Sequence, residues 1–176
     1  FHPAMRFVGP IRKELGMKTF FNLLGPLLNP AKVTKQLTGV YSKEVFDLYR
    51  GFFEAGDKKF GIVYAADGYD EISLTSSFDI STKAGLKTYQ PSDIGFDTFA
   101  QAELSGGETV AQSADIMYKI LQREGTPAQT QAVLANAGAA LWVAEKAPSL
   151  ADGILMAKES LESGKAFQSF KKFIMD

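Results

Sequence analysis

The fold is decided by Phe60-Gly61-Ile62-Val63-Tyr64-Ala65-Ala66, which is followed at once by Asp67-Gly68-Tyr69-Asp70-Glu71. The first seven residues are a near-continuous apolar run of strand length, which is typical of a strand buried on both faces. Further strands are expected at 37–41, 72–76, 78–82 and 86–90. Helices are predicted either by apolar residues at helical spacing or by residues that cap helix ends. They are expected at 4–15, 18–24, 42–56, 109–123, 128–146, 149–164 and 166–175. Strands that alternate with helices predict an α/β fold, with a sheet layered by helices.

The composition excludes several kinds of function. The chain has 176 residues, of which 45% are apolar and 22% charged, and its net charge is -1. This near-neutral balance gives no field that would attract nucleic acid or an anionic membrane, and no apolar run approaches the length of a membrane span. There is no cysteine, so disulfides, zinc–thiolate sites and cysteine nucleophiles are excluded. We expect a cytoplasmic protein with neither a nucleic-acid nor a membrane partner.

The strongest candidate site is the acidic segment after the central strand. Ligand sites in open α/β sheets lie at the carboxyl ends of strands. Asp70 and Glu71 supply adjacent carboxylates, the hard oxygen ligands that Mg²⁺ takes when it bridges protein to substrate phosphates. The same residues also fit a polar turn, in which Asp and Gly serve turn geometry alone.

Two other candidates lie near the start of the chain. His2 is the only histidine, and Arg6 and Arg12 are six residues apart, so they do not share one helix face. An inward-facing arginine could clamp a carboxylate or phosphate, although surface solvation explains a single arginine equally. Gly25 and Pro26 belong to a rigid apolar loop, 22–30, which could wall a ligand tunnel or simply join two domains.

Two further segments have simpler interpretations. The turn at 105–108, Ser-Gly-Gly-Glu, precedes a helix and could hold a phosphate, but a helix cap explains it as well. Asn136 begins a run of small residues, Asn-Ala-Gly-Ala-Ala, which we assign to close helix packing. The sequence has no GxGxxG fingerprint, P-loop or GxSxG elbow.

A series of motifs in one order resembles the anthranilate phosphoribosyltransferases. The motifs are His2-Pro3-Ala4-Met5-Arg6, Pro10-Ile11-Arg12-Lys13-Glu14-Leu15-Gly16, Thr19 to Ala31, Gln36, Gly39-Val40-Tyr41, Asp67 to Glu71, and Asn136-Ala137. The resemblance implies transfer of a phosphoribosyl group from phosphoribosyl pyrophosphate to anthranilate in tryptophan biosynthesis, with Mg²⁺ as cofactor. It implies that Arg12 contacts anthranilate, that His2, Met5, Gly25 and Pro26 line the anthranilate path, and that Asp70 and Glu71 bind magnesium.

The resemblance also implies a two-domain fold of the nucleoside phosphorylase/phosphoribosyltransferase type. Residues 1–30 would return to a small helical domain, and 31–176 would form the C-terminal part of the α/β domain. Family members carry an earlier half with a Gly-Thr-Gly-Gly-Asp loop and a Lys-His-Gly-Asn segment, and neither occurs here. We therefore expect a fragment that is inactive alone, taken from a full-length enzyme that is a homodimer.

Two alternative functions also deserve comparison with the sequence. A non-catalytic, nucleic-acid-binding relative of the same family should show a basic surface. The net charge of -1 disfavours this alternative. A pyrimidine nucleoside phosphorylase shares the architecture, but the run Gly25-Pro26-Leu27-Leu28-Asn29-Pro30 fits that family poorly.

Overall fold

The computed structural model describes residues 14, 23–28 and 31–175, and the chain divides into two compact units, Phe1–Thr34 and Lys35–Asp176. In the first unit, a helical turn at Leu23 and Leu24 continues into the 3-10 helix η1 (Gly25–Leu28). The sequence predicts that this helix stops at Gly25-Pro26, and the α-helical residues do end at Leu24. The loop expected after them is a 3-10 helix instead, because the fixed φ of proline suits a first helical turn as well as a loop. The helix expected at 4–15 and most of the one at 18–24 lie outside the described residues.

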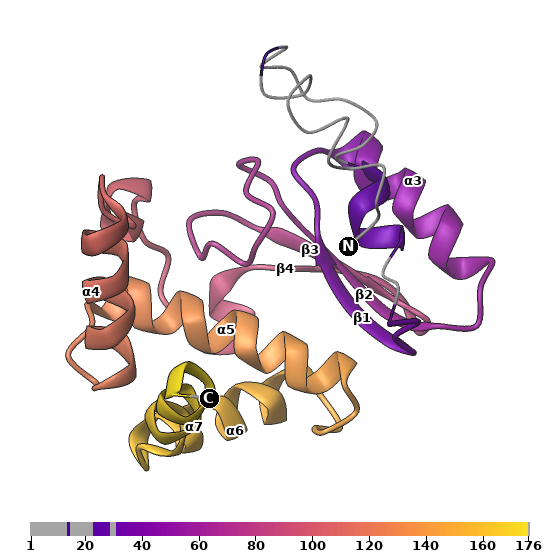
Figure 1. Ribbon diagram of the computed structural model, residues 1–176. Helices are drawn as coiled ribbons and strands as arrows, with labels where there is room; N and C mark the ends of the chain where they lie inside the picture. Colours follow the sequence, from indigo (N-terminus) through magenta and orange to yellow (C-terminus); the bar gives the residue numbers. More distant parts are fainter. Residues whose placement is uncertain (1–13, 15–22, 29–30, 176) are drawn as a thin grey trace. The chain divides into compact units, whose positions relative to one another are not determined.

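The second unit is built on a four-stranded sheet (Figure 1). Its strands are β1 (Lys35–Gly39), β2 (Lys59–Ala65), β3 (Phe78–Thr82) and β4 (Gly85–Tyr89), in the spatial order β1-β2-β3-β4. β1 and β2 are parallel and are connected through α3 (Lys43–Glu54), whereas β3 and β4 follow as antiparallel neighbours. The predicted α/β class is confirmed.

The remaining helices follow the sheet in the chain. They are η2 (Pro91–Ile94), η3 (Gln101–Leu104), α4 (Val110–Leu121), α5 (Pro127–Val143), α6 (Leu150–Glu162) and α7 (Lys165–Met175). The helices α3 to α6 each begin at a hydroxyl residue whose side chain accepts a backbone N–H three residues later: Ser42, Thr109, Thr126 and Ser149. Such caps satisfy N–H groups that would lack partners at a helix start.

Alternate residues of β2 face different helices, so the sheet is a middle layer. On one face Phe60 stacks on Phe53 of α3, with ring centroids 5.4 Å apart. On the other face, a Cβ on Gly61 would lie 2.5 Å from a methyl of Val143 in α5. Figure 1 shows α3 on one side of the sheet and α5 with α6 on the other. The prediction that this strand is buried on both faces is confirmed.

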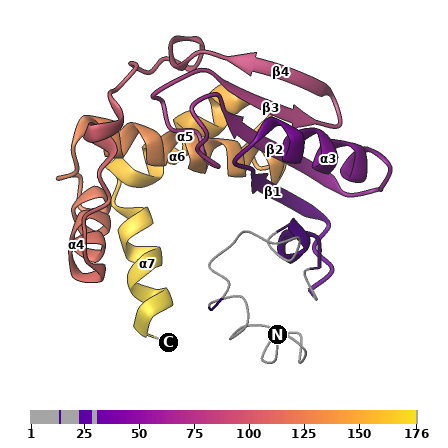
Figure 2. The same cartoon turned by 90° about the horizontal axis from the view of Figure 1, so that it is seen from above.

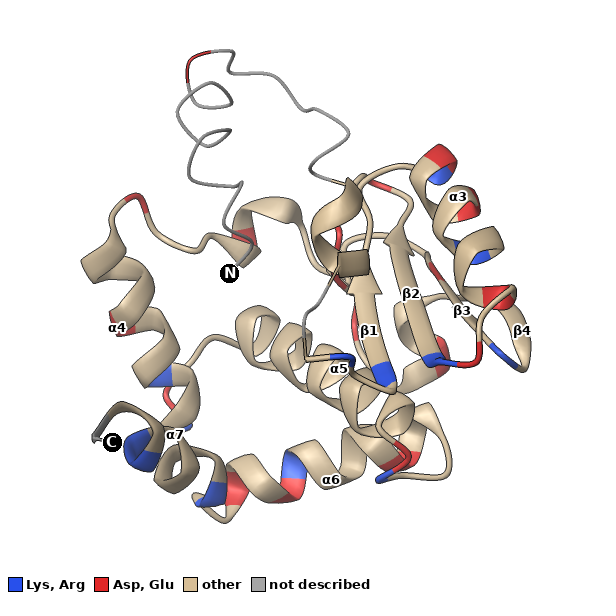
Figure 3. Ribbon diagram, turned by 45° about the vertical axis from the view of Figure 1, so that its right-hand side comes forward, with Lys and Arg blue, Asp and Glu red and all other residues tan. Residues whose placement is uncertain are grey.

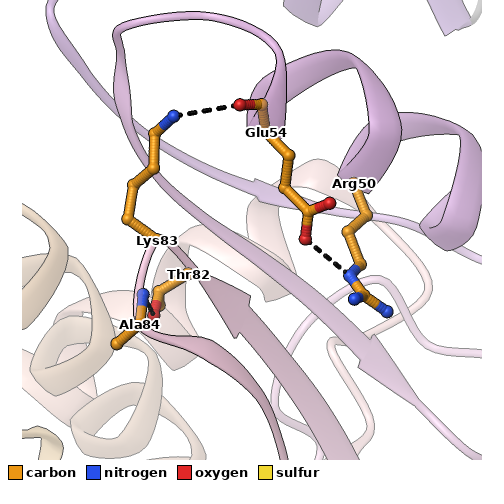
Figure 4. A network of polar contacts seen from close by, with 5 residues as sticks. All are labelled: Arg50, Glu54, Thr82, Lys83 and Ala84. Carbon is orange, nitrogen blue, oxygen red and sulfur yellow. Dashed lines mark hydrogen bonds and ion pairs between the residues drawn. The ribbon is translucent and has the colours of Figure 1, made fainter.

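Polar contacts hold α3 to the sheet. Lys83, in the turn between β3 and β4, donates to the carbonyl oxygen of Glu54 at 3.2 Å (Figure 4). It also donates to the carbonyl oxygen of Gly56 at 2.5 Å. Within α3 itself, Arg50 pairs with the Glu54 carboxylate at 2.8 Å. A cation at the last carbonyls of a helix is favourable because those groups lack partners within the helix.

Beyond the sheet, α4 and α7 lie beside one another (Figure 2). The Tyr118 ring of α4 meets the rings of Phe167 and Phe170 edge to face, at centroid distances of 6.2 and 5.5 Å. Within the described ranges, we find no helix with both the length and the apolarity needed to cross a membrane.

The strand predicted at 72–76 is wrong. This segment forms an irregular loop, in which Ile72 and Leu74 are both fully buried. Leu74 has φ +62°, a left-handed conformation that a strand does not contain. The backbone groups bond elsewhere: Ile72 to the side chain of Asn136, and the Leu74 carbonyl to the N–H of Phe99 at 3.0 Å. Apolar and hydroxyl residues alternate here as they would in a strand. Both apolar side chains also enter the same core, as they would from one face of a strand.

Candidate functional site

The acidic segment lies where the two parallel strands end. β1 ends at Gly39 and β2 at Ala65, and the chain then leaves the sheet through the loop 66–77. A Cβ on Gly39 would stand 1.4 Å from the carbonyl oxygen of Asp70. Only glycine permits this approach, so the loop lies directly against the end of β1. This is the edge at which open α/β sheets bind ligands.

Asp67 anchors the loop at its start. Its carboxylate accepts hydrogen bonds from the hydroxyls of Ser73, at 3.5 Å, and Thr75, and its N–H donates to Ser76 Oγ at 3.3 Å. Burial acts to raise the pKa of Asp67, but hydrogen bonds from Thr75, Ser76 and Gln101 outweigh it, and the net pKa lies below its ordinary value. These contacts commit Asp67 to the loop, so it is not a third member of the acidic pair.

Asp70 and Glu71 form the exposed acidic pair. Burial, repulsion by Asp70 and a hydrogen bond shared with Asp70 all raise the pKa of Glu71, so the two carboxyl groups are close neighbours. Across the described part of the chain, neither makes an ion pair with a lysine or arginine. A divalent cation would relieve this repulsion. The structure thus brings together the two residues that the sequence predicts as metal ligands.

Among the described residues, the pair alone supplies the carboxylates of the candidate site. In the residues that the structure describes, no group of three or more His, Cys, Asp or Glu could hold a metal ion. Mg²⁺ typically takes one or two carboxylates and fills the rest of its shell with water and substrate phosphates. Two carboxylates at the edge of a sheet therefore fit an ion that is shared with a phosphorylated substrate.

Asn136 of α5 has a contact that the sequence analysis did not predict. We assigned its segment to packing, but its side chain bonds both backbone groups of Ile72, the residue directly after the acidic pair. The signals in the sequence are its place in the motif series, as Asn136-Ala137, and an amide side chain in the middle of an alanine-rich helix. Its partner lies 64 residues away in the chain, so spacing alone could not identify it.

The other candidates are distributed as follows. Gly25 and Pro26 lie in η1 of the first unit, and His2, Met5, Arg6 and Arg12 lie outside the described residues. The turn at 105–108 is a helix cap. The N–H groups of Glu108 and Thr109 both donate to Gln112 Oε1, at 2.7 and 3.1 Å, so they are already occupied and do not form an open phosphate cradle.

The opposite end of the strands carries a different arrangement. Glu145 pairs with Lys35 at 2.7 Å and Lys59 at 2.9 Å, the first residues of β1 and β2, which Figure 3 shows in blue. The two lysines lower the pKa of Glu145 to about 2 through hydrogen bonds and charge. A hollow of about 480 Å³ lies beside it, between Trp142 and Pro148. Because the acidic pair lies at the other edge of the sheet, we assign this arrangement to holding the strand starts and not to the candidate site.

The parallel pair of strands, the helix-covered sheet and the acidic pair at its carboxyl edge define an α/β domain with a candidate ligand site at the strand ends. Residues 1–167 match the glycosyl transferase family, a/b domain. The chain therefore belongs to this glycosyl transferase family.

Individual relatives narrow the comparison. The anthranilate phosphoribosyltransferase of Cytophaga hutchinsonii is 47% identical over 174 residues, which are 99% of this chain and 53% of that protein. The crystal structure of the Thermus thermophilus enzyme of the same name has a TM-score of 0.90 at 34% identity, over 99% of this chain and 53% of that chain. The structure of the Saccharomyces cerevisiae enzyme, in complex with PRPP and Mg, has a TM-score of 0.86 at 29% identity, over 99% of this chain and 50% of that chain.

These comparisons confirm the resemblance drawn from the motifs and the assignment to the C-terminal α/β domain. The chain spans about half the length of the curated relatives that it matches.

Proposed function

We propose that the natural protein containing these residues transfers a phosphoribosyl group from phosphoribosyl pyrophosphate to anthranilate, giving N-(5-phosphoribosyl)anthranilate and pyrophosphate in tryptophan biosynthesis. The observation that carries the proposal is the acidic pair, Asp70 and Glu71, held at the carboxyl edge of the sheet without a cationic partner in the described part of the chain. Relatives named for this activity include one that shares 47% identity with the chain.

The donor set fits Mg²⁺. Asp70 and Glu71 would hold the ion through hard carboxylate oxygens, and Asp67 keeps its own oxygens for the loop. When bound, the ion supplies positive charge that neutralises the departing pyrophosphate. The protein's contribution is to fix the two carboxylates before substrate binds, because preorganised charge costs no rearrangement during the reaction.

The anthranilate contacts are proposed from the resemblance. Arg12 would read the carboxylate of anthranilate, and His2, Met5, Gly25 and Pro26 would line its path. An arginine suits this role because its planar guanidinium can bond both carboxylate oxygens. The resemblance further favours a cytoplasmic homodimer, and a net charge of -1 favours small substrates over nucleic acid.

The test is to replace the acidic pair by Asp70→Asn with Glu71→Gln in the natural protein. These changes keep size and remove charge. Losing charge-assisted bonds of roughly 1.5–3 kcal/mol should raise the half-saturating magnesium concentration about ten- to hundred-fold. Turnover is measured against magnesium with both substrates, and circular dichroism checks folding.

Arg12→Ala provides the matched comparison. It should raise the KM for anthranilate far more than the KM for phosphoribosyl pyrophosphate, and it should leave the magnesium titration unchanged. An unchanged magnesium titration in the Asp70/Glu71 variant would show that the pair serves turn geometry and does not bind the ion. Wild-type protein that cleaves thymidine with phosphate, and ignores anthranilate, would indicate a pyrimidine nucleoside phosphorylase instead.

A further inference from the structure

Asn136 contacts the acidic loop through its whole amide group. Its Oδ1 accepts the N–H of Ile72 at 3.0 Å, and its Nδ2 donates to the carbonyl oxygen of Ile72 at 2.9 Å. The same Nδ2 donates to the carbonyl oxygen of Ala132, one turn earlier in α5, at 2.9 Å. The side chain is therefore tied to its own helix while it holds both backbone groups of one loop residue.

The residue that it holds is next to the acidic pair. The N–H of Ile72 belongs to the peptide unit that carries the Glu71 carbonyl, and that unit is planar. Fixing this N–H therefore fixes the direction in which the chain leaves Glu71. A side chain with a single hydrogen-bonding atom could hold only the N–H or only the carbonyl of Ile72. The peptide could then still rotate.

Other contacts restrict the loop without replacing this one. Asp67 fixes the chain before the pair, and the close approach of Asp70 to Gly39 sets its distance from β1. After the pair, Ile72 and Leu74 are fully buried, and Leu74 adopts φ +62°. Such strain persists only where surrounding contacts over-determine the conformation. The two hydrogen bonds between Ile72 and the Asn136 side chain connect the loop to α5.

We propose that Asn136 is a positioning residue of the metal site: it orients the Asp70–Glu71 pair by holding Ile72, and it thereby sets the affinity of the pair for a divalent cation. The inference rests on the proposed magnesium site and adds to it a residue that touches neither ion nor substrate. Partners that orient metal ligands in this way typically change metal affinity about ten- to hundred-fold when they are removed.

The test uses Asn136→Ala in the natural protein, with Mn²⁺ in place of Mg²⁺ so that free ion can be counted by electron paramagnetic resonance. Mn²⁺ is titrated in the presence of pyrophosphate, a titration of pyrophosphate without protein is subtracted to correct for chelation, and the measurement needs no turnover. We expect the dissociation constant for Mn²⁺ to rise about tenfold or more. If the alanine variant does not fold, Asn136→Ser, which keeps a smaller polar group, is measured in its place, with a rise in the same direction.

Two variants on the same helix separate positioning from stability. Gln131 accepts the N–H of Asp97 at 3.4 Å, so Gln131→Ala removes a helix-to-loop bond at a loop without the acidic pair. Leu134 is buried against Ala157 and Leu161, so Leu134→Ala lowers the melting temperature from another face of α5. Both should bind Mn²⁺ within about twofold of wild type.

The outcomes distinguish the two proposals. Mn²⁺ binding that is intact in Asn136→Ala and in Asn136→Ser overturns the positioning role and leaves the metal site standing. A rise in the dissociation constant that Leu134→Ala reproduces at the same loss of melting temperature also overturns it, since stability alone would then explain the effect. Wild-type protein that binds no Mn²⁺ with pyrophosphate overturns the metal site, and the inference with it.

Discussion

Glu145 joins three parts of the second unit through one exposed carboxylate. Its two oxygens reach Lys35 and Lys59 at the starts of neighbouring parallel strands, and Lys35 also donates to the Ala144 carbonyl oxygen at 2.7 Å. The residue has φ +58°, a conformation that is unfavourable for a side chain with a Cβ. The bridge to two lysines offers a reason for this position at the end of α5.

The pH dependence of stability should report this bridge. The pKa of Glu145 falls from 4.5 to about 2 on folding, so its stabilisation is complete above about pH 4.5 and is lost as the pH falls towards 2. Glu145→Gln should therefore lower the urea midpoint of unfolding at neutral pH, with a difference that shrinks on acidification. Because the pair is exposed, high salt should also reduce the difference. A difference that stays constant with pH and salt would show that the charge does not matter.

Single residues differ in how far the sequence reveals them. Asp70 and Glu71 were predictable because carboxylates that follow a buried strand must lie at the edge of the sheet. The separate role of Asp67 was not, since it depends on Ser73, Thr75 and Ser76 folding back onto it. The Asn136 contact needs the tertiary fold, which brings α5 against the loop.

The helices α5 and α6 approach each other through two glycines. A Cβ on Gly153 would stand 2.3 Å from the Gly138 carbonyl oxygen, and a Cβ on Gly138 would stand 2.5 Å from the Ile154 side chain. Both glycines are buried. Backbone therefore meets backbone, which places α6 close beneath the helix that carries Asn136.

Adding one methyl group at this contact should separate the helices. Gly153→Ala should destabilise the protein by about 1–3 kcal/mol, the usual cost of overpacking, measured by chemical denaturation. Gly51→Ala in α3 is the control, because no atom lies within 4 Å of its added Cβ. There alanine should stabilise the helix by about 0.5–1 kcal/mol. Equal stabilities of the two variants would contradict the close contact.

Elements were predictable where local chemistry determines them. Ser42, Thr109 and Ser149 mark helix starts through their own hydroxyls, and the structure places the caps there. The 72–76 segment failed because periodicity reports which residues are apolar, and not where their backbone groups bond. Its hydrogen bonds go to a helix and to a distant loop residue, neither of which leaves a mark in the local sequence.

At the scale of the molecule, the second unit contains a core of its own. The main cluster draws on the sheet, the acidic loop, α5 and α6, and its buried members lie between Val63 and Ile154. The α/β class followed from alternating strands and helices, whereas the strand order required long-range pairing that the sequence does not display. The boundary between the two units falls at Thr34, just before β1.

A chain of these 176 residues, purified alone, should fold and show no turnover. The self-contained core predicts cooperative unfolding of the second unit. Inactivity is expected because the phosphate-binding loop that the family resemblance implies is not among these residues. Well-oriented proximity of substrates can lower the activation barrier by roughly 7–11 kcal/mol. The assay combines both substrates with magnesium, beside the natural protein. Turnover within about tenfold of the natural protein would refute the proposal that the pyrophosphate is gripped elsewhere.

The hollow beside Glu145 has a practical consequence for spectroscopy. Its wall includes Trp142, the only tryptophan in the sequence, which packs against the main core. Tryptophan emission therefore follows the second unit alone. Because the chain has no cysteine, a thiol introduced at Leu28 in η1, which is 65% exposed, could be labelled at one position. In the 176-residue chain, energy transfer from Trp142 to that dye would then measure the separation of the two units in solution.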